Sequence, residues 1–211
     1  MKRTFQLSLL GVAVALIATA FTYNSSDEKE FKSLAIGELA PNLHQKLKDV
    51  SGKEMMLREM GQENGLLVIF SCNTCPFVIA WEDRYNELFD LCSSNKIGMV
   101  LVNSNEAKRD GADSFEAMKK KAAEEGYKSM YVVDKNAELA DAFGARTTPH
   151  VYLFDNQFKL SFVGAIDDNY ESRDGVSKTY LRDAINNTLA GKSIDPAETT
   201  PKGCSIKRVK R

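Results

Sequence analysis

The chain has 211 residues, of which 43% are hydrophobic and 27% charged, a composition typical of a globular domain. Basic and acidic residues nearly balance, at 28 against 29, and the formal net charge of -1 gives no reason to expect a nucleic-acid partner. Four cysteines are too few for a scaffold held together by disulfides, but they suffice for one reactive pair and two further thiols.

The first twenty residues have the pattern of a secretory signal peptide. Lys2 and Arg3 precede an uncharged run over 7–21, and Ala18-Thr19-Ala20 offers the small residues of a cleavage site. An uncleaved membrane anchor is the alternative, because the uncharged span 4–26 is nearly long enough to cross a bilayer. Either way we expect an exported protein, periplasmic or otherwise extracytoplasmic. The predicted organisation is a signal peptide over 1–20, a linker over 21–34, one domain over 35–192 and a C-terminal tail over 193–211.

The rest of the chain alternates short apolar runs with helical patterns. Asp49-Val50-Ser51-Gly52-Lys53 predicts the turn of a β-hairpin within 43–57. Strands are expected at 66–70, 98–102, 130–133, 151–154 and 160–163, and helices at about 76–91, 113–125, 137–143 and 179–190, with Asp113 as the N-cap of the second helix. Such alternation indicates an α/β fold with a central mixed sheet, mostly parallel, flanked by helices on both faces. The N-terminal hairpin and an inserted strand–helix unit at 130–143 extend it.

Two cysteines stand where the first buried strand leads into a helix. Cys72 and Cys75 follow the apolar run 66–70. A helix stripe comes after them, made of Val78, Trp81, Tyr85, Leu88 and Cys92. A helix N-terminus offers unpaired N–H groups and lowers the pKa of a thiol placed there. Residues three apart share one side of a helix, so Cys75 is expected to reach Cys72 and close a small disulfide.

This pattern predicts a redox dithiol in which Cys72 is the nucleophile and Cys75 resolves the mixed disulfide. A structural disulfide or half of a zinc site is the alternative. Zinc normally takes four ligands in paired spacing, whereas the chain has only His44 and His150 and no second CxxC. We therefore expect no metal at the two cysteines. The uncharged Asn73-Thr74 between them does not fix the direction of electron flow.

Four further features have a structural and a functional interpretation. Cys92 lies on the apolar stripe and is expected to be a small core residue. Cys204 is either a loose tail thiol or a third redox cysteine that folds back to the site. Glu82-Asp83-Arg84 faces away from the stripe and predicts a solvated surface. His150 is expected to be an ordinary strand residue, with a metal ligand or proton carrier as the alternative.

Three features over about 35–190 resemble the thioredoxin superfamily. They are the strand–CxxC–helix junction, Arg146-Thr147-Thr148-Pro149 before a strand, and Ile36-Gly37-x-x-Ala40-Pro41 with Asp49-x-x-Gly52. The last is similar to the N-terminus of the alkyl hydroperoxide reductase and thiol-specific antioxidant branch. The resemblance implies a thioredoxin fold with a cis Pro149 beside the dithiol, where Thr148 and Pro149 bind an extended substrate segment. The closing residues 203–207 are similar to a tail of some redoxin-like proteins.

The resemblance also implies an activity and its partners. It predicts a thiol-disulfide oxidoreductase without a cofactor, acting on disulfide-containing proteins and reset by another redox protein, such as a membrane-bound electron donor. Ser71 stands where thioredoxins usually have Trp. A peroxiredoxin of this branch carries Thr or Ser three residues before its reactive cysteine and Pro four residues earlier still. Counted back from Cys72, these two positions hold Ile69 and Gly65, so the typical peroxidase motif is absent. A peroxiredoxin-like antioxidant peroxidase remains one alternative, and a non-enzymatic thioredoxin-fold metal-binding chaperone that uses His150 is the other.

Overall fold

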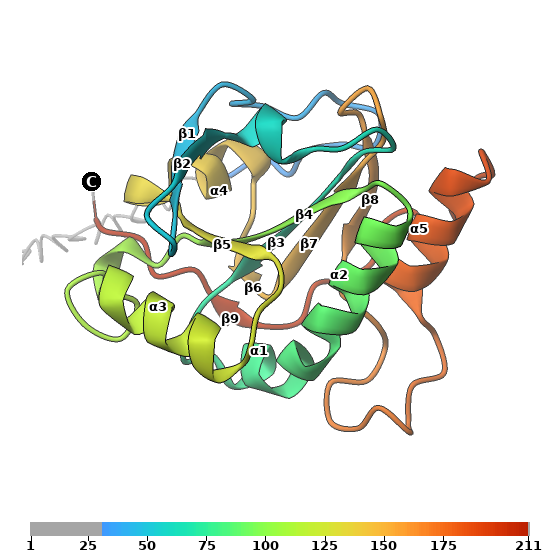
Figure 1. Ribbon diagram of the computed structural model, residues 1–211. Helices are drawn as coiled ribbons and strands as arrows, with labels where there is room; N and C mark the ends of the chain where they lie inside the picture. Colours follow the sequence, from blue (N-terminus) through green and yellow to red (C-terminus); the bar gives the residue numbers. More distant parts are fainter. Residues whose placement is uncertain (1–30, 211) are drawn as a thin grey trace, which may run out of the picture. The chain divides into compact units, whose positions relative to one another are not determined.

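The computed structural model describes residues 31–210 (Figure 1). The predicted signal peptide and residues 21–30 of the predicted linker therefore lie outside the described residues. No helix within 31–210 combines the length and the apolar character that a membrane crossing needs.

The described residues form a seven-stranded sheet in the order β2-β1-β5-β4-β3-β7-β8, and a separate pair of short strands, β6 and β9. The strands are β1 Lys46–Asp49, β2 Glu54–Met56, β3 Leu66–Ser71, β4 Gly98–Asn103, β5 Met130–Val133, β6 Thr147–Thr148, β7 His150–Phe154, β8 Leu160–Gly164 and β9 Cys204–Ser205. The helices are α1 Pro76–Trp81, α2 Tyr85–Ser94, α3 Phe115–Glu124, α4 Glu138–Phe143 and α5 Tyr180–Leu189. Short 3-10 turns cover η1 Leu57–Met60, η2 Glu82–Arg84, η3 Glu106–Lys108 and η4 Lys135–Ala137.

The sheet is mixed, as predicted, but it is not mostly parallel. Among the named strands of residues 31–210, only the pairs β3·β4 and β4·β5 are parallel. The hairpin β1–β2 joins the β5 edge antiparallel, and β7 pairs antiparallel with both β3 and β8. The predicted hairpin is confirmed and adds two strands to the edge of the main sheet. The predicted strand–helix unit is confirmed by β5 and α4.

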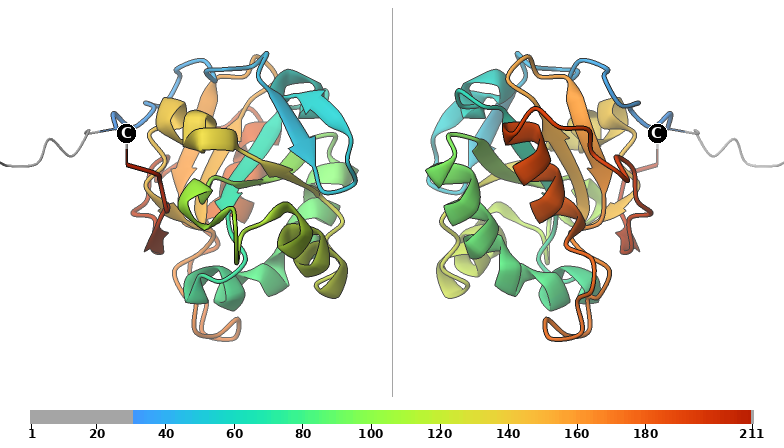
Figure 2. Two further views of the ribbon diagram at one scale, coloured as in Figure 1. Left: turned by 90° about the vertical axis from the view of Figure 1, so that its left-hand side faces the viewer. Right: turned by 90° about the vertical axis from the view of Figure 1, so that its right-hand side faces the viewer.

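The interior strand β3, which lies between β4 and β7, is fully buried because both faces of the sheet are covered. Its residues Leu66, Val68 and Phe70 face a core cluster that includes α4 and the hairpin. Leu67 and Ile69 face the opposite cluster, which is built from α2, α3 and α5. Figure 2 shows α2 and α5 on one side of the sheet and α4 on the other. This two-sided cover explains why the strand has no polar alternation.

The helix after the cysteines is two helices joined by a 3-10 turn. The predicted apolar stripe is confirmed, because each of its side chains is at most 4% exposed: Val78, Trp81, Tyr85, Leu88 and Cys92. Cys92 is therefore a core residue, as predicted. However, α1 ends at Trp81 and α2 begins only at Tyr85, after η2. The tighter 3-10 turn changes which side chains point inward at this step.

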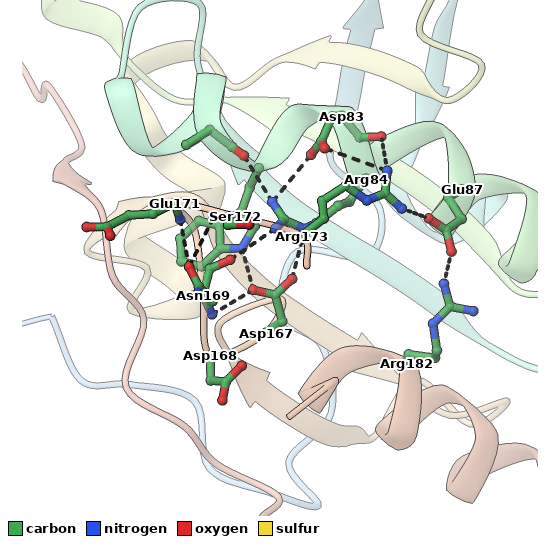
Figure 3. Close-up of polar contacts among 12 residues, drawn as sticks. Asp83, Arg84, Glu87, Asp167, Asp168, Asn169, Glu171, Ser172, Arg173 and Arg182 are labelled. Carbon is green, nitrogen blue, oxygen red and sulfur yellow. Dashed lines mark hydrogen bonds and ion pairs between the residues drawn. The ribbon is translucent and has the colours of Figure 1, made fainter. Parts of the chain in front are cut away.

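The prediction of a solvated surface at Glu82-Asp83-Arg84 is wrong for two of the three residues. Arg84 is only 6% exposed, and its Nε lies 3.0 Å from Oδ2 of Asp167, in the loop after β8 (Figure 3). One of its Nη atoms donates to the carbonyl of Asn169 at 3.0 Å. Burial of a guanidinium is tolerated here because a carboxylate and carbonyl groups satisfy it.

Glu82 is turned inward as well, and only Asp83 stays exposed among the three. The Glu82 side chain is 8% exposed and accepts hydrogen bonds from Nζ of Lys121 at 2.9 Å and from the hydroxyl of Tyr127 at 2.8 Å. These contacts tie η2 to α3 and to the segment after it. The turn between α1 and α2 is therefore a packing junction between three elements.

Candidate active site

Cys72 and Cys75 lie in the loop between β3 and α1, and both are buried, at 2% and 4% exposed. As predicted, α1 begins at Pro76, and Cys75 is its N-cap, so neither cysteine lies within the helix. Cys75 has an extended backbone, with φ -70° and ψ 124°, and the residue before a proline is disfavoured in the helical region. The two side chains meet with Val78 in one apolar cluster through the bend of the loop, instead of through helical spacing.

The two thiols are coupled to each other. The neighbouring Cys72 thiol lowers the pKa of Cys75 to about 4. The Cys75 thiol in turn, and burial after it, raise the pKa of Cys72. These opposite shifts describe the pair and not either residue alone, because the two sulfurs share one proton, and the contacts of Thr148 decide which sulfur carries the charge. The neighbouring thiol, and not the end of the six-residue α1, is the main cause.

Thr148 contacts the two sulfurs through different groups. Its hydroxyl lies 3.3 Å from Sγ of Cys72, and its carbonyl oxygen accepts from Sγ of Cys75 at 3.1 Å. An arrangement with the charge on Cys72 and the proton on Cys75 satisfies both contacts, because a hydroxyl can donate to a thiolate and a carbonyl only accepts. The Thr148–Pro149 bond is cis, as the resemblance implies. The structure thus brings Cys72, Cys75, Thr148 and Pro149 together.

The structure places Cys204, in the C-terminal tail, beside the dithiol. Strand β9 pairs antiparallel with β6, so that Cys204 lies opposite Thr148. Cys204 packs against the cluster of Cys72, Cys75 and Val78. The neighbouring Cys75 thiol raises the pKa of the Cys204 thiol. The tail residue therefore folds back onto the site.

Asp113, which the sequence pattern predicts to be a helix N-cap, is instead a buried carboxylate that holds the cysteine loop. Asp113 is fully buried and is not a helix cap, since Ser114 caps α3. Its Oδ1 accepts the backbone N–H of Asn73 at 2.9 Å and the amide of Asn103 at 2.7 Å, and its Oδ2 accepts the amide of Asn105 at 3.0 Å. The signal available in the sequence is the pair of asparagines directly after a buried strand, where α/β sheets place their sites.

The same network continues under the loop through aromatic hydroxyls. The hydroxyl of Tyr131 donates to Oδ1 of Asn73 at 2.8 Å and accepts the amide of Asn103 at 2.9 Å. The hydroxyls of Ser71 and Tyr85 lie 3.1 Å apart. These side chains are buried or nearly so, and each has its partner. The loop carrying the cysteines therefore sits on a satisfied polar layer that fixes its conformation.

His150 lies close in sequence to the site but is part of the core. It is 4% exposed, and its Nδ1 accepts the backbone N–H of Arg146 at 3.4 Å. Burial, and secondly the charge of Arg146, lower its pKa to about 3, so the ring is neutral at physiological pH. Within residues 31–210, no three His, Cys, Asp or Glu side chains are grouped as a metal site would require.

A separate hollow of about 310 Å³ lies between α2 and the loop that leads to α5. Its lining includes three arginines and no cysteine. Each arginine is paired, and three carboxylates face the three: Arg84 pairs with Asp167, Arg182 with Glu87, and Arg173 with Glu87 and Asp83 (Figure 3). The positive charge of this hollow is thus already neutralised by the protein.

Comparison with known proteins gives a family and a fold. Residues 36–163 match the model of the AhpC/TSA family, and no curated protein matches. An uncharacterized conserved protein from Geobacillus kaustophilus is 30% identical, with a TM-score of 0.75 over 85% of this chain and 95% of its own. A hypothetical protein from Sinorhizobium meliloti 1021 is 28% identical, with a TM-score of 0.77 over 85% and 98%.

A more distant structure shares the fold alone. The peroxidoxin BcpB from Mycobacterium tuberculosis is 13% identical, with a TM-score of 0.57 over 75% of this chain and 97% of its own. The mixed sheet and its flanking helices are thus those of a thioredoxin fold, as predicted. With more than half of its length matched, the chain belongs to the AhpC/TSA family, within the redoxin branch of the thioredoxin superfamily.

Proposed function

We propose that this protein is a thiol-disulfide oxidoreductase that exchanges disulfides with protein partners through Cys72 and Cys75. The observation that carries the proposal is the contact of two coupled thiols with opposite groups of one residue, Thr148. The pair holds a thiolate well below the usual thiol pKa, and a thiolate is the reactive species in disulfide exchange. Membership of a redoxin family supports the same class of chemistry.

The exchange proceeds in two steps with Cys72 as the nucleophile. Its thiolate attacks one sulfur of a partner disulfide, forming a mixed disulfide and releasing the partner's other sulfur as a thiolate. Cys75 then loses its proton and attacks Cys72, which frees the partner as a dithiol and leaves a Cys72–Cys75 disulfide. Two electrons pass to the partner, and a second redox protein returns them; the reverse sequence oxidises a partner.

The partner segment is expected to pair with the backbone at Thr147–Thr148, next to Pro149. This edge lies beside both sulfurs, so an extended chain there brings its own cysteine within reach. We place the reaction outside the cytoplasm, on the strength of the leader pattern in residues 1–20. N-terminal sequencing of the exported protein tests this part, and a mature chain that begins after Ala20 is the expected result.

The test of the exchange is trapping of mixed disulfides. A Cys75→Ser variant should accumulate covalent complexes through Cys72, whereas Cys72→Ser, its matched control, should not. Titration of a Cys204→Ser variant, which keeps both active-site cysteines, against a glutathione series should show one Cys72–Cys75 disulfide. A reduction potential near -270 mV, as for thioredoxin, would indicate a reductant, and a potential of about -120 mV would indicate an oxidant. If no disulfide forms between Cys72 and Cys75 at any ratio of oxidised to reduced glutathione, the proposal is overturned.

An antioxidant peroxidase is a second candidate because the matched family includes this activity in its name, AhpC/TSA. In that case Cys72 alone would react with peroxide to a sulfenic acid, and Cys75 would condense with it to the disulfide. Hydrogen peroxide consumption by the purified protein separates the two functions. Single-turnover consumption that persists in Cys75→Ala but disappears in Cys72→Ala would favour the peroxidase.

A further inference from the structure

The edge that a partner segment would need is occupied by the protein's own C-terminal tail. Strand β9 pairs with β6 so that Thr147 lies opposite Ser205 and Thr148 opposite Cys204 (Figure 1). The backbone N–H of Ile206 donates to the carbonyl of Arg146 at 2.9 Å, which continues the pairing by one residue. The tail therefore lies as an extended substrate would, with a cysteine at the position nearest the dithiol.

Specific contacts hold the tail in this place. A Cβ on Gly203 would lie 2.2 Å from the carbonyl oxygen of Thr148, so glycine permits the close approach. Ile206 is 5% exposed and belongs to the core cluster around α4. The backbone N–H of Lys207 donates to Oδ1 of Asn105 at 2.8 Å, and Arg208 pairs with Asp141 at 2.7 Å. A segment fixed on both sides of Cys204 keeps that thiol close to the dithiol.

The tail is also coupled to the loop that carries the cysteines. Asn105 accepts from the tail and donates to Asp113, which in turn accepts the backbone N–H of Asn73. On the other side, Cys204 packs against the cluster of Cys72, Cys75 and Val78, and the Cys75 thiol raises the pKa of the Cys204 thiol. Cys75 thus has a thiol neighbour on each side, Cys72 in the loop and Cys204 in the tail.

We propose that Cys204 is a third redox cysteine, which exchanges with the dithiol through Cys75 and thereby fastens the tail over the Thr147–Thr148 edge. The proposal rests on the dithiol chemistry proposed above. The Cys204 thiolate attacks Sγ of Cys75 in the Cys72–Cys75 disulfide. The Cys75–Cys204 bond forms, the Cys72–Cys75 bond breaks, and Cys72 leaves as a thiolate that takes up the proton lost by Cys204. No electrons are gained or lost, so no further oxidant is required.

The exchange has a consequence for access to the site. A Cys75–Cys204 disulfide holds β9 against β6 and excludes a partner strand, while Cys72 remains free. Reduction of that disulfide leaves only hydrogen bonds and side-chain contacts to hold the tail, which a competing strand can replace. Oxidation by way of Cys72 and Cys75 would therefore close the site, and reduction would open it.

The test uses the full chain in a Cys92→Ala background, which removes the remaining thiol. The variant Cys72→Ser keeps only Cys75 and Cys204, and the variant Cys204→Ser keeps only Cys72 and Cys75. Both are equilibrated with oxidised and reduced dithiothreitol over a range of ratios, alkylated, digested and mapped by mass spectrometry. Circular dichroism verifies the fold, and Cys72→Ala replaces Cys72→Ser if the latter does not fold.

The expected result is an intramolecular Cys75–Cys204 disulfide in the first variant and a Cys72–Cys75 disulfide in the second. With all three thiols present, each molecule should carry one disulfide, found in both pairings. Two free thiols in the first variant, at ratios where the second is closed, would overturn the third-cysteine proposal and leave the dithiol intact. An open second variant beside a closed first one would instead contradict the proposed dithiol function.

Discussion

At the scale of single residues, burial and not position in the sequence decides what His150 does. Its pKa is lowered to about 3, chiefly by burial. In the unfolded chain a histidine titrates near 6.5. Between these values only the unfolded state binds the proton, so stability falls as the pH drops through the window from about 6.5 to 3. At about 1.4 kcal/mol per pH unit, the free energy of unfolding falls by an amount on the order of 4–5 kcal/mol at the lower end of this window.

His150→Gln removes this titration while keeping an acceptor for the Arg146 N–H. We expect the variant to lose less stability than the wild type between pH 6.5 and 4, as measured by urea unfolding at each pH. His44→Gln is the matched control, because His44 is exposed and is the other histidine of the chain. Equal slopes of stability against pH in His150→Gln and the wild type would contradict the account.

Asp113 is a residue whose role follows from what donates to it. Three N–H groups, from Asn73, Asn103 and Asn105, converge on its carboxylate. Asp113→Asn replaces one acceptor oxygen by a donor, so a buried N–H loses its partner, at a cost of about 1–3 kcal/mol. The urea concentration at the midpoint of unfolding should fall. The pH profile of the reaction of Cys72 and Cys75 with iodoacetamide should also change.

The control for this prediction is Asp110→Asn on the exposed surface nearby. That change should alter the free energy of unfolding by no more than about 0.5 kcal/mol. It should leave the thiol reactivity unchanged. If Asp113→Asn lowered stability but left the pH profile of thiol reactivity unchanged, Asp113 would support the fold without positioning the cysteine loop.

At the scale of elements, the strands and the apolar stripe could be predicted from the sequence because each depends on local periodicity. The break after Trp81 could not, since it depends on Asp167, which is 86 residues away in sequence and binds both Trp81 and Arg84. The start of α1 at Pro76 could also be predicted, because a proline fits the first turn of a helix. The pairing β6·β9 joins a two-residue strand to a tail with no strand pattern, so periodicity carries no signal for it.

The pairing β6·β9 makes a prediction about Gly203. In Gly203→Ala the added methyl group meets the Thr148 carbonyl, so the tail should move away from β6. Hydrogen exchange at the Ile206 amide, which donates to Arg146, should become faster by tenfold or more. In the Cys72→Ser background the same change should slow closure of the Cys75–Cys204 disulfide.

Gly111→Ala serves as the matched control, because a Cβ there has its nearest neighbour at 3.9 Å. It should leave both the Ile206 exchange and the disulfide closure unchanged. Unaltered exchange at Ile206 in Gly203→Ala would mean that the loop of Thr148 adjusts to the methyl group and that the tail keeps its place.

At the scale of the whole described chain, both of its ends pack on the domain. The N-terminal side is held by the backbone N–H of Leu34, which donates to the carbonyl of Phe143 at 3.1 Å. On the C-terminal side, Thr199 and Ala197 bond the backbone of Val163 on the outer edge of β8. The guanidinium of Arg208 lies over the ring of Phe31 at 4.1 Å. Composition and charge bound the size and class of the domain, but contacts between segments so far apart leave no local pattern.

Residues 193–210 therefore make a prediction that concerns the stability of the whole domain. A chain that ends at Lys192 loses the partners of the β8 edge, the burial of Ile206 and the Arg208–Asp141 ion pair. A chain that ends at Pro201 keeps the β8 partners and loses only the part around β9. Removal of a buried isoleucine side chain alone costs about 2–5 kcal/mol. We expect the free energy of unfolding in urea to fall in two steps, from the full chain to the end at Pro201 and again to the end at Lys192. Equal stability of all three would show that the segment rests on a domain that is complete without it, and Cys204 would then be free to leave the dithiol at no cost to the fold.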